Sequence, residues 1–424
     1  MENNRKNRRD FIKEMSLIAS STAFLSSIPW LNAFAAENGK DIAASDRVRL
    51  GIIGVGSRGR ALLLNLQEVN NADIVAVCDN YEPNYQRAIK LTNGKANAYY
   101  DYRKMLDKEK LDGVVIATPL HEHAHITVDS LNAGLHVFCE KSMARTLEDC
   151  KWMADTHKAT GKILQIGHQR LFNPIYLNAL ERVKAGEIGQ ITQVRAYWHR
   201  NNDWRRPVPS PELERKINWR LYKEYSAGLM TELASHQLQV ANWFIDKVPT
   251  RVMGSGSNCY WKHGREVYDQ VALVYDYDNG TRCIYDSLTS NKHYGLEEQI
   301  MGDKGTIEPE VNRIYSESPP QAPAIRQLVN NIEKGVFDII PIGGASWVPE
   351  TAVEYKGDMI TEYANNDTFL QMVGFVKAVK MGKPYKNLFR EGYHSSIGVL
   401  LGLQAMDNNE IVSWPEEYIL EKEV

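Results

Sequence analysis

Residues 48–59 read Val-Arg-Leu-Gly-Ile-Ile-Gly-Val-Gly-Ser-Arg-Gly and join an apolar run to a Gly-x-Gly-x-x-Gly spacing. The apolar run is typical of a buried strand, and the glycines are spaced as in a turn that cradles a dinucleotide pyrophosphate. Gly54 permits the tight turn, Gly56 lets the backbone approach the phosphates, and Gly59 lets the next helix pack closely. Unpaired N–H groups at the start of that helix favour anions. We therefore predict a dinucleotide site here.

A second strand pattern and an acidic residue strengthen this prediction. Residues 74–78 read as another buried strand, and Asp79 follows the last glycine by about 20 residues. A carboxylate at this point accepts hydrogen bonds from the ribose hydroxyls and repels a 2′-phosphate. The sequence therefore favours NAD over NADP. Arg58 and Arg87 keep NADP open, because either guanidinium could meet a phosphate, although each also suits a solvated surface.

The N-terminus resembles a twin-arginine export signal. Arg8-Arg9 precedes a modestly apolar stretch that ends at Ala33-Phe34-Ala35, a small-x-small cleavage pattern. We expect residues 1–35 to be removed and the mature protein to be periplasmic or otherwise exported, without stable membrane insertion. The alternative is an uncleaved amphipathic helix or membrane anchor, which Pro29 disfavours. Because the destination holds little free NAD, the cofactor is expected to stay bound and be recycled.

The charge, the cysteine count and the length limit the classes of protein to which this chain can belong. The 424 residues include 50 Lys plus Arg and 53 Asp plus Glu, and the formal charge of −3 gives no reason to propose a nucleic-acid partner. The five cysteines show no CxxC or His-paired spacing, so we expect neither a disulfide framework nor a metal site. A mature chain of about 390 residues exceeds one ordinary core and fits two domains.

The pattern of expected strands and helices changes near residue 170, which predicts an α/β protein of two domains. Strands and helices alternate over residues 46–170, as in a doubly wound NAD-binding Rossmann domain. Residues 171–424 are expected to form an α+β substrate-binding domain with an open-faced, largely antiparallel sheet. Residues 309–366 read as an irregular excursion. The helices expected in the second domain cover residues 229–244, a segment capped by Asp367, and residues 393–406.

Several short motifs resemble those of one oxidoreductase family. They are Thr118-Pro119, Glu140-Lys141, Gly186-Glu187-Ile188-Gly189, residues 228–236, residues 301–305 and Glu391-Gly392-Tyr393. As a set they resemble the Gfo/Idh/MocA family, which includes glucose-fructose oxidoreductase and inositol dehydrogenase. The resemblance implies an NAD(P)-binding Rossmann domain, a sheet domain that lines the substrate cleft, and a homo-oligomer formed through the C-terminal sheet. The family's usual Glu-Lys-Pro reads Glu140-Lys141-Ser142 here.

Hydride transfer from a carbinol carbon needs a base for the hydroxyl proton and a donor for the developing carbonyl oxygen. His236 is the best candidate base, because imidazole titrates near working pH. Glu232 lies four residues earlier on the same expected helical face, where it can orient the ring. Lys141, at the C-terminal end of a strand, can hold the reacting oxygen. The alternatives are a surface Glu232–His236 pair and a solvated Lys141.

The resemblance supports these catalytic roles and shows two departures. In the family an aspartate and a histidine four residues apart act with the lysine. This chain has Glu232 in place of that aspartate, and Gln239 where many members carry a further aspartate. The identity of the base and of the substrate hydroxyl therefore stays open.

Further polar residues are assigned to the cofactor and the substrate. His121, His123 and His125 suggest a metal cluster, but no carboxylate or cysteine completes a zinc set. The resemblance implies that His123 lies near the nicotinamide. The expected cofactor-binding residues are Gly54, Gly56, Ser57, Arg58, Gly59, Asp79, Thr118, Pro119, His123, Glu140 and Lys141. Aromatic faces with polar neighbours suit a sugar ring, although core or dimer packing explains single tryptophans equally well. The expected substrate-binding residues are His168, Arg170, Trp204, Arg205, Trp219 and Tyr222.

Three functions fit these observations. The preferred one is an exported NAD-dependent oxidoreductase of a carbohydrate: a sugar, a glycoside or a cyclitol. The second is redox-assisted glycoside cleavage, in which transient oxidation acidifies a neighbouring C–H and elimination expels the aglycone. A related branch of exported N-acetylgalactosaminidases works in this way, but its motif lysine is typically replaced, so Lys141 favours net oxidation or reduction. The third is a non-catalytic sugar or cofactor sensor, against which Lys141, Glu232 and His236 argue together.

Overall fold

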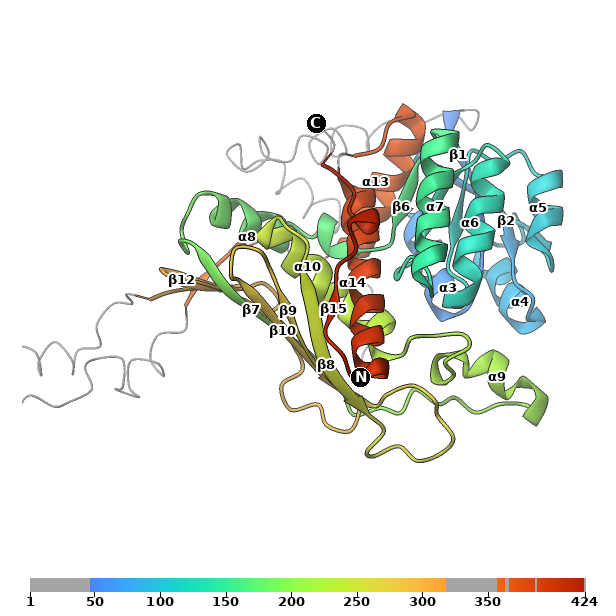
Figure 1. The fold of residues 1–424 in the computed structure, drawn as a ribbon. Helices are drawn as coiled ribbons and strands as arrows, with labels where there is room; N and C mark the ends of the chain where they lie inside the picture. The colour runs from blue at the N-terminus through green and yellow to red at the C-terminus, as the bar shows by residue number, and fades with distance from the viewer. Residues whose placement is uncertain (1–45, 318–356, 363–365, 386, 423–424) are drawn as a thin grey trace, which may run out of the picture.

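The computed structural model describes residues 46–317, 357–362, 366–385 and 387–422. Two layered units lie side by side, with the C-terminal helices between them (Figure 1). The signal predicted over residues 1–35 and most of the excursion predicted over residues 309–366 lie outside the described residues. None of the helices described is both long and apolar enough to span a membrane.

The N-terminal unit is a parallel six-stranded sheet in the order β3-β2-β1-β4-β5-β6. Alternate residues of the central strands face opposite layers, so Val115 packs in one apolar cluster and Val114 in the other. Helices on both faces confirm the doubly wound prediction (Figure 1). The strand order reverses between β1 and β4, where such folds bind ligands. The elements are β1 (Val48–Ile53), α3 (Ser57–Gln67), β2 (Ala72–Cys78), α4 (Glu82–Leu91), β3 (Asn97–Tyr99), α5 (Tyr102–Lys108), β4 (Gly113–Ile116), α6 (His123–Asn132), β5 (His136–Cys139), α7 (Leu147–Thr160) and β6 (Leu164–Ile166).

The second unit is a nine-stranded sheet in the order β14-β13-β12-β11-β7-β10-β9-β8-β15. Among the described strands of this second sheet only β7 and β10 pair in parallel, which confirms a largely antiparallel sheet. Val194 and Ala196 are buried, whereas Arg195 between them is exposed on the opposite face. The elements are α8 (Pro174–Lys184), β7 (Ile191–His199), α9 (Glu214–Ile217), α10 (Ser235–Ile245), β8 (Arg251–Ser257), β9 (Gln270–Asp276), β10 (Arg282–Leu288), β11 (Leu296–Gly302), β12 (Gly305–Glu308), β13 (Arg313–Ser316), β14 (Asp358–Met359) and β15 (Val412–Ser413).

The structure corrects the predicted assignment of helix α13 (Asp367–Met381). Its residues Phe369 and Val373 pack in the same apolar cluster as Leu50 of β1 and Leu62 of α3. The helix therefore completes the Rossmann unit rather than the substrate domain predicted over residues 171–424. An amphipathic pattern reveals that a helix has an apolar face, but not which sheet covers that face. The cap position is also one residue earlier than predicted, at Asn366.

Helix α14 (Leu388–Asn408) joins the two units. It packs against α10 and β8 of the second unit and against α7 and β6 of the first (Figure 1). Gly392 makes this approach possible, because a Cβ there would lie 2.5 Å from Cβ of Ile166 on β6. The helix thereby fixes the carboxyl edge of the parallel sheet relative to α10, which carries His236.

Candidate active site

The glycine loop after β1 has the shape that a dinucleotide requires. Gly54 has a φ of +83°, a left-handed conformation that glycine adopts readily. A Cβ at Gly59 would lie 1.9 Å from the Gly54 carbonyl oxygen, whereas a Cβ at Gly56 would have only Asn84 Nδ2 nearby, at 4.0 Å. Thr118 Oγ1 is buried and has no hydrogen-bond partner within the described part of the chain. The loop is thus tightly fixed, while Gly56 and Thr118 leave space and an unused polar atom for a ligand such as NAD.

Asp79 follows β2 directly, and main-chain and side-chain donors hold its carboxylate. It accepts hydrogen bonds from the N–H groups of Val55 and Tyr81, both at 2.9 Å, and from the Asn84 amide at 3.2 Å. Burial raises the pKa of Asp79, against the effect of these hydrogen bonds. Each carboxylate oxygen can accept more than one hydrogen bond, so capacity for ribose hydroxyls remains.

Arg58 and Arg87, the two arginines that left NADP as an alternative cofactor, lie in different surroundings. Arg58 Nε donates a hydrogen bond to Glu140 Oε1 at 2.7 Å, and this carboxylate raises the pKa of the guanidinium. Arg87 is exposed on α4. Arg58 is therefore engaged by a carboxylate, which makes it a poor partner for a 2′-phosphate.

A cavity of about 520 Å³ adjoins Asp79 and extends under a segment of the second unit. We call this segment, residues 211–225, the strap. Lys216 Nζ donates a hydrogen bond to the Asn80 carbonyl oxygen at 2.7 Å, and the Tyr225 ring lies 4.7 Å from the His121 ring. The strap therefore contacts the Rossmann unit on both sides of this cavity. The lining residues include Gly54, Asp79, Thr118 and Pro119 from the Rossmann unit and Glu212, Arg215, Lys216, Trp219 and Tyr225 from the strap.

A second cavity, of about 720 Å³, lies between the glycine loop and the nine-stranded sheet. Trp219 lines both cavities and so stands at their junction. Residues from the two units meet here, which fits a site where a cofactor and a substrate come together. The lining residues include Ser57, Arg58, Thr118, His123, Glu140, Lys141, Trp198, Arg200, Asn202, Trp204, Arg205, Arg206, Trp219, Arg220, Glu232 and His236.

Lys141 projects from the end of β5 to the main chain of a helical turn in the second unit. Its Nζ donates hydrogen bonds to the carbonyl oxygens of Glu232 at 2.8 Å and Thr231 at 3.3 Å. Residues 230–234 form a π-helical turn, a local widening of a helix that is frequent at functional sites. Burial lowers the pKa of Lys141, although the carboxylates of Glu232 and Glu140 oppose this shift. The lysine is thus fixed in the cavity without a direct carboxylate partner.

The structure corrects the predicted role of Glu232. Its carboxylate accepts a hydrogen bond from Arg220 Nε at 2.7 Å. Among the described residues, Glu232 and His236 share no side-chain hydrogen bond. Burial disfavours the charged form, but Arg220 and Lys141 outweigh it and lower the pKa of Glu232. The expected pairing assumes α-helical spacing, whereas the π-helical turn alters the direction of side chains four residues apart.

His236 lies in the first turn of α10 and faces the same cavity as Lys141. Its ring centroid lies 5.5 Å from that of Trp198 and 6.0 Å from that of His168. Burial, followed by the nearby charges of Lys141 and Arg170, holds the pKa of His236 well below the ordinary histidine value. The ring is therefore neutral at physiological pH and able to accept a proton.

His123 joins the ends of two parallel strands. Its Nδ1 lies 2.9 Å from the Ser142 carbonyl oxygen and its Nε2 lies 3.1 Å from the Thr118 carbonyl oxygen. Burial lowers the pKa of this imidazole, although both carbonyls favour the protonated form. His123 lines the larger cavity, so its predicted part in positioning the cofactor would be exerted through the loops that it holds.

The neighbouring histidines do not form the metal cluster considered from sequence. His121 Nε2 and His125 Nε2 each lie 3.0 Å from a carboxylate oxygen of Glu122. These contacts lower the pKa of Glu122, with His121 as the largest contributor. Within the described residues no group of three or more His, Cys, Asp or Glu side chains could hold a metal ion.

Three predicted substrate ligands lie outside both cavities, and their roles are corrected. His168 is fully buried, and burial lowers its pKa to about 3. Arg170 is 4% exposed and pairs with Glu298 and Glu310, each at 2.7 Å. The Tyr222 hydroxyl donates to Glu214 Oε1 at 2.8 Å. The position of a polar residue next to a predicted crevice does not reveal whether its side chain faces the cavity or the core, because that depends on tertiary packing.

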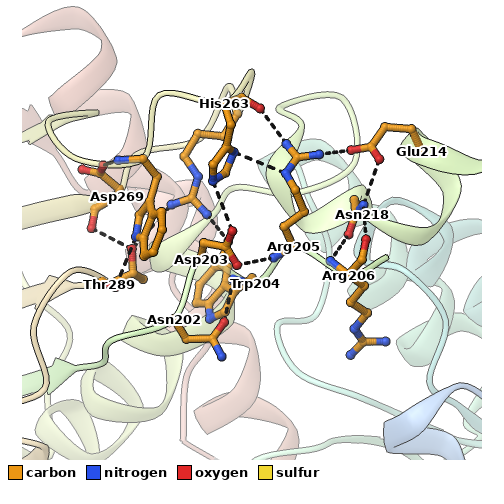
Figure 2. A network of polar contacts seen from close by, with 12 residues as sticks. Asn202, Asp203, Trp204, Arg205, Arg206, Glu214, Asn218, His263, Asp269 and Thr289 are labelled. Atoms are coloured by element: carbon orange, nitrogen blue, oxygen red, sulfur yellow. Dashed lines mark hydrogen bonds and ion pairs between the residues drawn. The ribbon is translucent and has the colours of Figure 1, made fainter. Parts of the chain in front are cut away.

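The other predicted substrate residues, Trp204, Arg205 and Trp219, line the larger cavity. Arg205 lies between Glu214 and His263, and Asn218 contacts the main chain of Arg206 (Figure 2). The structure adds cavity residues that were not among the predicted ligands: Trp198, Arg200, Asn202, Arg206 and Arg220. Trp198 lies near the end of β7 and the other four lie in the polar and aromatic stretch after it, whose richness in Trp and Arg was their only sequence signal.

The fold and the two cavities define a class, the NAD-binding oxidoreductases with a Rossmann domain. A model described as "Oxidoreductase family, NAD-binding Rossmann fold" matches residues 48–168, and one described as "GFO/IDH/MocA C-terminal domain" matches residues 176–308. The chain belongs to the Gfo/Idh/MocA family of oxidoreductases. This membership confirms the predictions of an enzyme of this class and of NAD as its cofactor.

Individual relatives are distant. The scyllo-inositol 2-dehydrogenase (NAD(+)) of Bacillus subtilis (strain 168) is 26% identical over 266 residues, which cover 62% of this chain and 73% of that protein. A glycosyl hydrolase family 109 protein of Shewanella baltica (strain OS195) is 28% identical over 235 residues, 51% of this chain and 50% of that protein. The structure of levoglucosan dehydrogenase with NADH and levoglucosan superposes with a TM-score of 0.66 at 19% identity, covering 87% of this chain and 100% of that one. This last similarity concerns the fold.

Proposed function

We propose that the protein is an NAD-dependent oxidoreductase that acts on a hydroxyl or keto group of a sugar, a glycoside or a cyclitol. The observation that carries this proposal is that Lys141 and His236 line the same cavity. Helix α3, which follows the glycine loop, also lines this cavity through Ser57 and Arg58. The names of relatives that act on inositols or levoglucosan support the substrate class.

The two side chains supply complementary chemistry. Bound NAD provides the hydride acceptor. Neutral His236 takes the proton of the substrate hydroxyl as the carbonyl forms, and in the reverse direction it returns that proton. The Lys141 ammonium donates a hydrogen bond to the reacting oxygen as negative charge develops there. Arg220 keeps the Glu232 carboxylate ionised, and the ionised carboxylate in turn favours the charged form of Lys141.

We further propose that the cofactor stays bound through successive turnovers in an exported protein. The strap supports retention, because Lys216 and Tyr225 hold it across the cavity beside Asp79. The twin-arginine pattern of residues 1–35 supports export. Retention would remove the need for a pool of free NAD in the destination compartment. The open face of the nine-stranded sheet, on which Arg195 is exposed, is the proposed surface of a homo-oligomer.

Redox-assisted glycoside cleavage is the second candidate, and the similarity to a glycosyl hydrolase family 109 protein favours it. That reaction starts with the same oxidation, so Lys141 and His236 could serve it too. The presence of Lys141 favours net oxidation or reduction, because the motif lysine is typically replaced in that branch.

One experiment tests both candidates. The purified protein is loaded with NAD and mixed with free sugars, inositols and aryl glycosides, while reduced nicotinamide is followed by absorbance and products are separated by chromatography. The proposed function predicts stoichiometric cofactor reduction and an oxidised sugar that keeps its substituents. Release of the aglycone without net reduction would instead establish cleavage. If no member of the panel changes the cofactor or is converted, the proposed carbohydrate activity is contradicted.

A further inference from the structure

The larger cavity carries an excess of positive charge. Its acidic lining residues are Glu140 and Glu232, whereas its basic lining residues are Arg58, Lys141, Arg200, Arg205, Arg206 and Arg220. Clefts lined by one sign of charge raise the local concentration of ligands with the opposite sign. The pairing of each cation therefore bears on the charge of the natural substrate.

Three of the six cations have carboxylate partners. Arg58 pairs with Glu140 and Arg220 pairs with Glu232, both at 2.7 Å. Arg205 pairs with Glu214, which lies just outside the cavity lining (Figure 2). These pairs use the acidic groups around the cavity. Lys141, Arg200 and Arg206 are left without a salt bridge to any described residue.

The two unpaired arginines have different neighbours. Arg206 contacts Asn218 only through its main chain, and its side chain ends without a partner among the residues drawn in Figure 2. Burial lowers the pKa of Arg206, with further contributions from the charges of Arg220 and Arg60. Arg60 belongs to the glycine-loop helix, so Arg206 is suited to face the phosphates of the cofactor.

Arg200 lies at the substrate end. Its guanidinium carbon is 4.7 Å from the centroid of the Trp198 ring, and that ring is 5.5 Å from the His236 ring. Burial alone lowers the pKa of Arg200, with no contribution from a neighbouring acid. Lys141 serves the reacting oxygen in the proposed function, and Arg206, near Arg60 of α3, is suited to the cofactor phosphates. Arg200, beside Trp198 and close to His236, is therefore the cation left for another group of the substrate.

We propose that the natural substrate is an acidic carbohydrate whose carboxylate or sulfate group binds Arg200. This inference rests on the proposed function and narrows its substrate class. A planar guanidinium presents paired N–H donors that match the oxygens of either anion. A neutral sugar can replace the hydrogen bonds of the displaced water through its hydroxyl groups, but it leaves the positive charge of Arg200 without a counter-charge in a desolvated site, which carries a free-energy cost. Stacking on Trp198 fixes the guanidinium plane beside the ring of the candidate base.

The test compares matched pairs of ligands on the NAD-loaded protein. Methyl glucuronide is compared with methyl glucoside, and galactose 6-sulfate with galactose, so that the two pairs distinguish a carboxylate from a sulfate ester. Affinities are measured by calorimetry at low and high salt, and cofactor reduction is measured separately. We expect the acidic member of at least one pair to bind about tenfold more tightly or better at low salt, with a smaller difference at high salt.

Two variants assign the effect to Arg200. Arg200→Gln should remove most of the preference for the acidic ligand, whereas Lys151→Gln, on the exposed surface of α7, should preserve it. Equal affinities within both pairs, or a preference that survives Arg200→Gln, would overturn the proposal. Tight binding of an acidic ligand without any cofactor reduction would support the charge assignment and contradict the proposed reaction, so the two can fail separately. Absence of binding by all four ligands overturns both.

Discussion

The Lys141 ammonium nitrogen lies 2.8 Å from the main-chain carbonyl oxygen of Glu232, while the carboxylate of the same glutamate turns to Arg220. One residue of the π-helical turn thus orients the lysine through its backbone and tunes its charge through its side chain. The Lys141 pKa reflects both effects, because burial lowers it and the Glu232 carboxylate opposes that shift. Lys141 and His236 then face the same cavity, the lysine as a hydrogen-bond donor and the imidazole, whose pKa is well below the ordinary value, as a proton acceptor.

Removal of either proposed catalytic group should separate binding from chemistry. Lys141→Ala and His236→Ala leave the glycine loop intact but remove the oxyanion donor or the base, each typically worth about 10²-fold or more in rate. We expect both variants to fold and to keep NAD, measured by circular dichroism and by cofactor release on denaturation. Substrate-dependent reduction should fall by about 10²-fold. Near-native reduction in both variants would move the base to another residue of the cavity, with His123 examined first.

The pH dependence of the reaction should show two displaced limbs. A base works in its neutral form, so activity that depends on His236 is lost as pH falls through its pKa, which is well below the ordinary value. The acid limb should therefore lie below the usual histidine range. Lys141 acts in its charged form and its pKa is lowered, so the alkaline limb should appear below the ordinary lysine value. The profile of kcat/KM measures both. An acid limb near the unperturbed histidine pKa would contradict a buried His236 base.

Asp79 should decide between the two dinucleotides. Asp79→Ala removes the carboxylate that meets the ribose hydroxyls, so NAD should bind about tenfold more weakly or worse. Affinity for NADP relative to NAD should improve, because the repulsion of a 2′-phosphate is lost. Titrations of the cofactor-free protein with each dinucleotide measure the ratio. Asn84→Ala, which removes one donor to the same carboxylate, serves as a milder control. An unchanged ratio in Asp79→Ala would show that Asp79 does not read the ribose.

The strap should control how long the cofactor remains. Lys216→Ala removes the 2.7 Å hydrogen bond to Asn80, and Trp219→Ala removes the side chain at the junction of the two cavities. Either change should accelerate NAD release about tenfold, because altered contacts affect dissociation more than association. Release is followed by exchange of bound NAD for an excess of a labelled analogue. Lys151→Ala, an exposed pair with Asp155 on α7, is the matched control. Equal release rates in all variants would show that the strap does not retain the cofactor.

Local patterns allowed much of the architecture to be predicted from sequence. The glycine loop, Asp79 and Lys141 lie at strand ends. These ends could be predicted because the hydrophobic period of a strand or helix can be recognised within a few residues. Strand β8 escaped prediction because Gly254 and Gly256 interrupt its apolar pattern. Those glycines fit against Leu273 and Tyr268, where a Cβ would lie 2.7 Å from each side chain.

The partners of charged residues could not be predicted in the same way. Arg170 forms an ion pair with Glu310, which is 140 residues away in sequence, so no local pattern predicts the pair. The π-helical turn that redirects Glu232 depends on packing against α14 and on the acceptors needed by Lys141. The set of cavity residues therefore follows from tertiary structure, even where the proposed catalytic pair, Lys141 and His236, was predicted from sequence.

Arg170 provides the last prediction, because its structural role differs from the substrate contact first expected of it. It is almost fully buried beside Glu298, whose pKa burial raises to about 7 even with Arg170 opposing the shift. Removing one partner of a buried ion pair typically costs 3–5 kcal/mol, so Arg170→Met should lower the free energy of unfolding by about that amount near neutral pH. Without the arginine the pKa of Glu298 rises further. The folded state then binds a proton that the unfolded state releases, so the variant should lose stability as pH rises from 6 to 8.

Denaturant unfolding at several pH values measures this effect, and Lys151→Met on the exposed surface of α7 is the control that should change stability little. Arg170→Met should leave the affinity for substrate nearly unchanged at a pH and temperature where the variant is folded. A stable variant with a strongly raised KM would restore Arg170 as a substrate ligand and remove it from the structural network of Glu298 and Glu310.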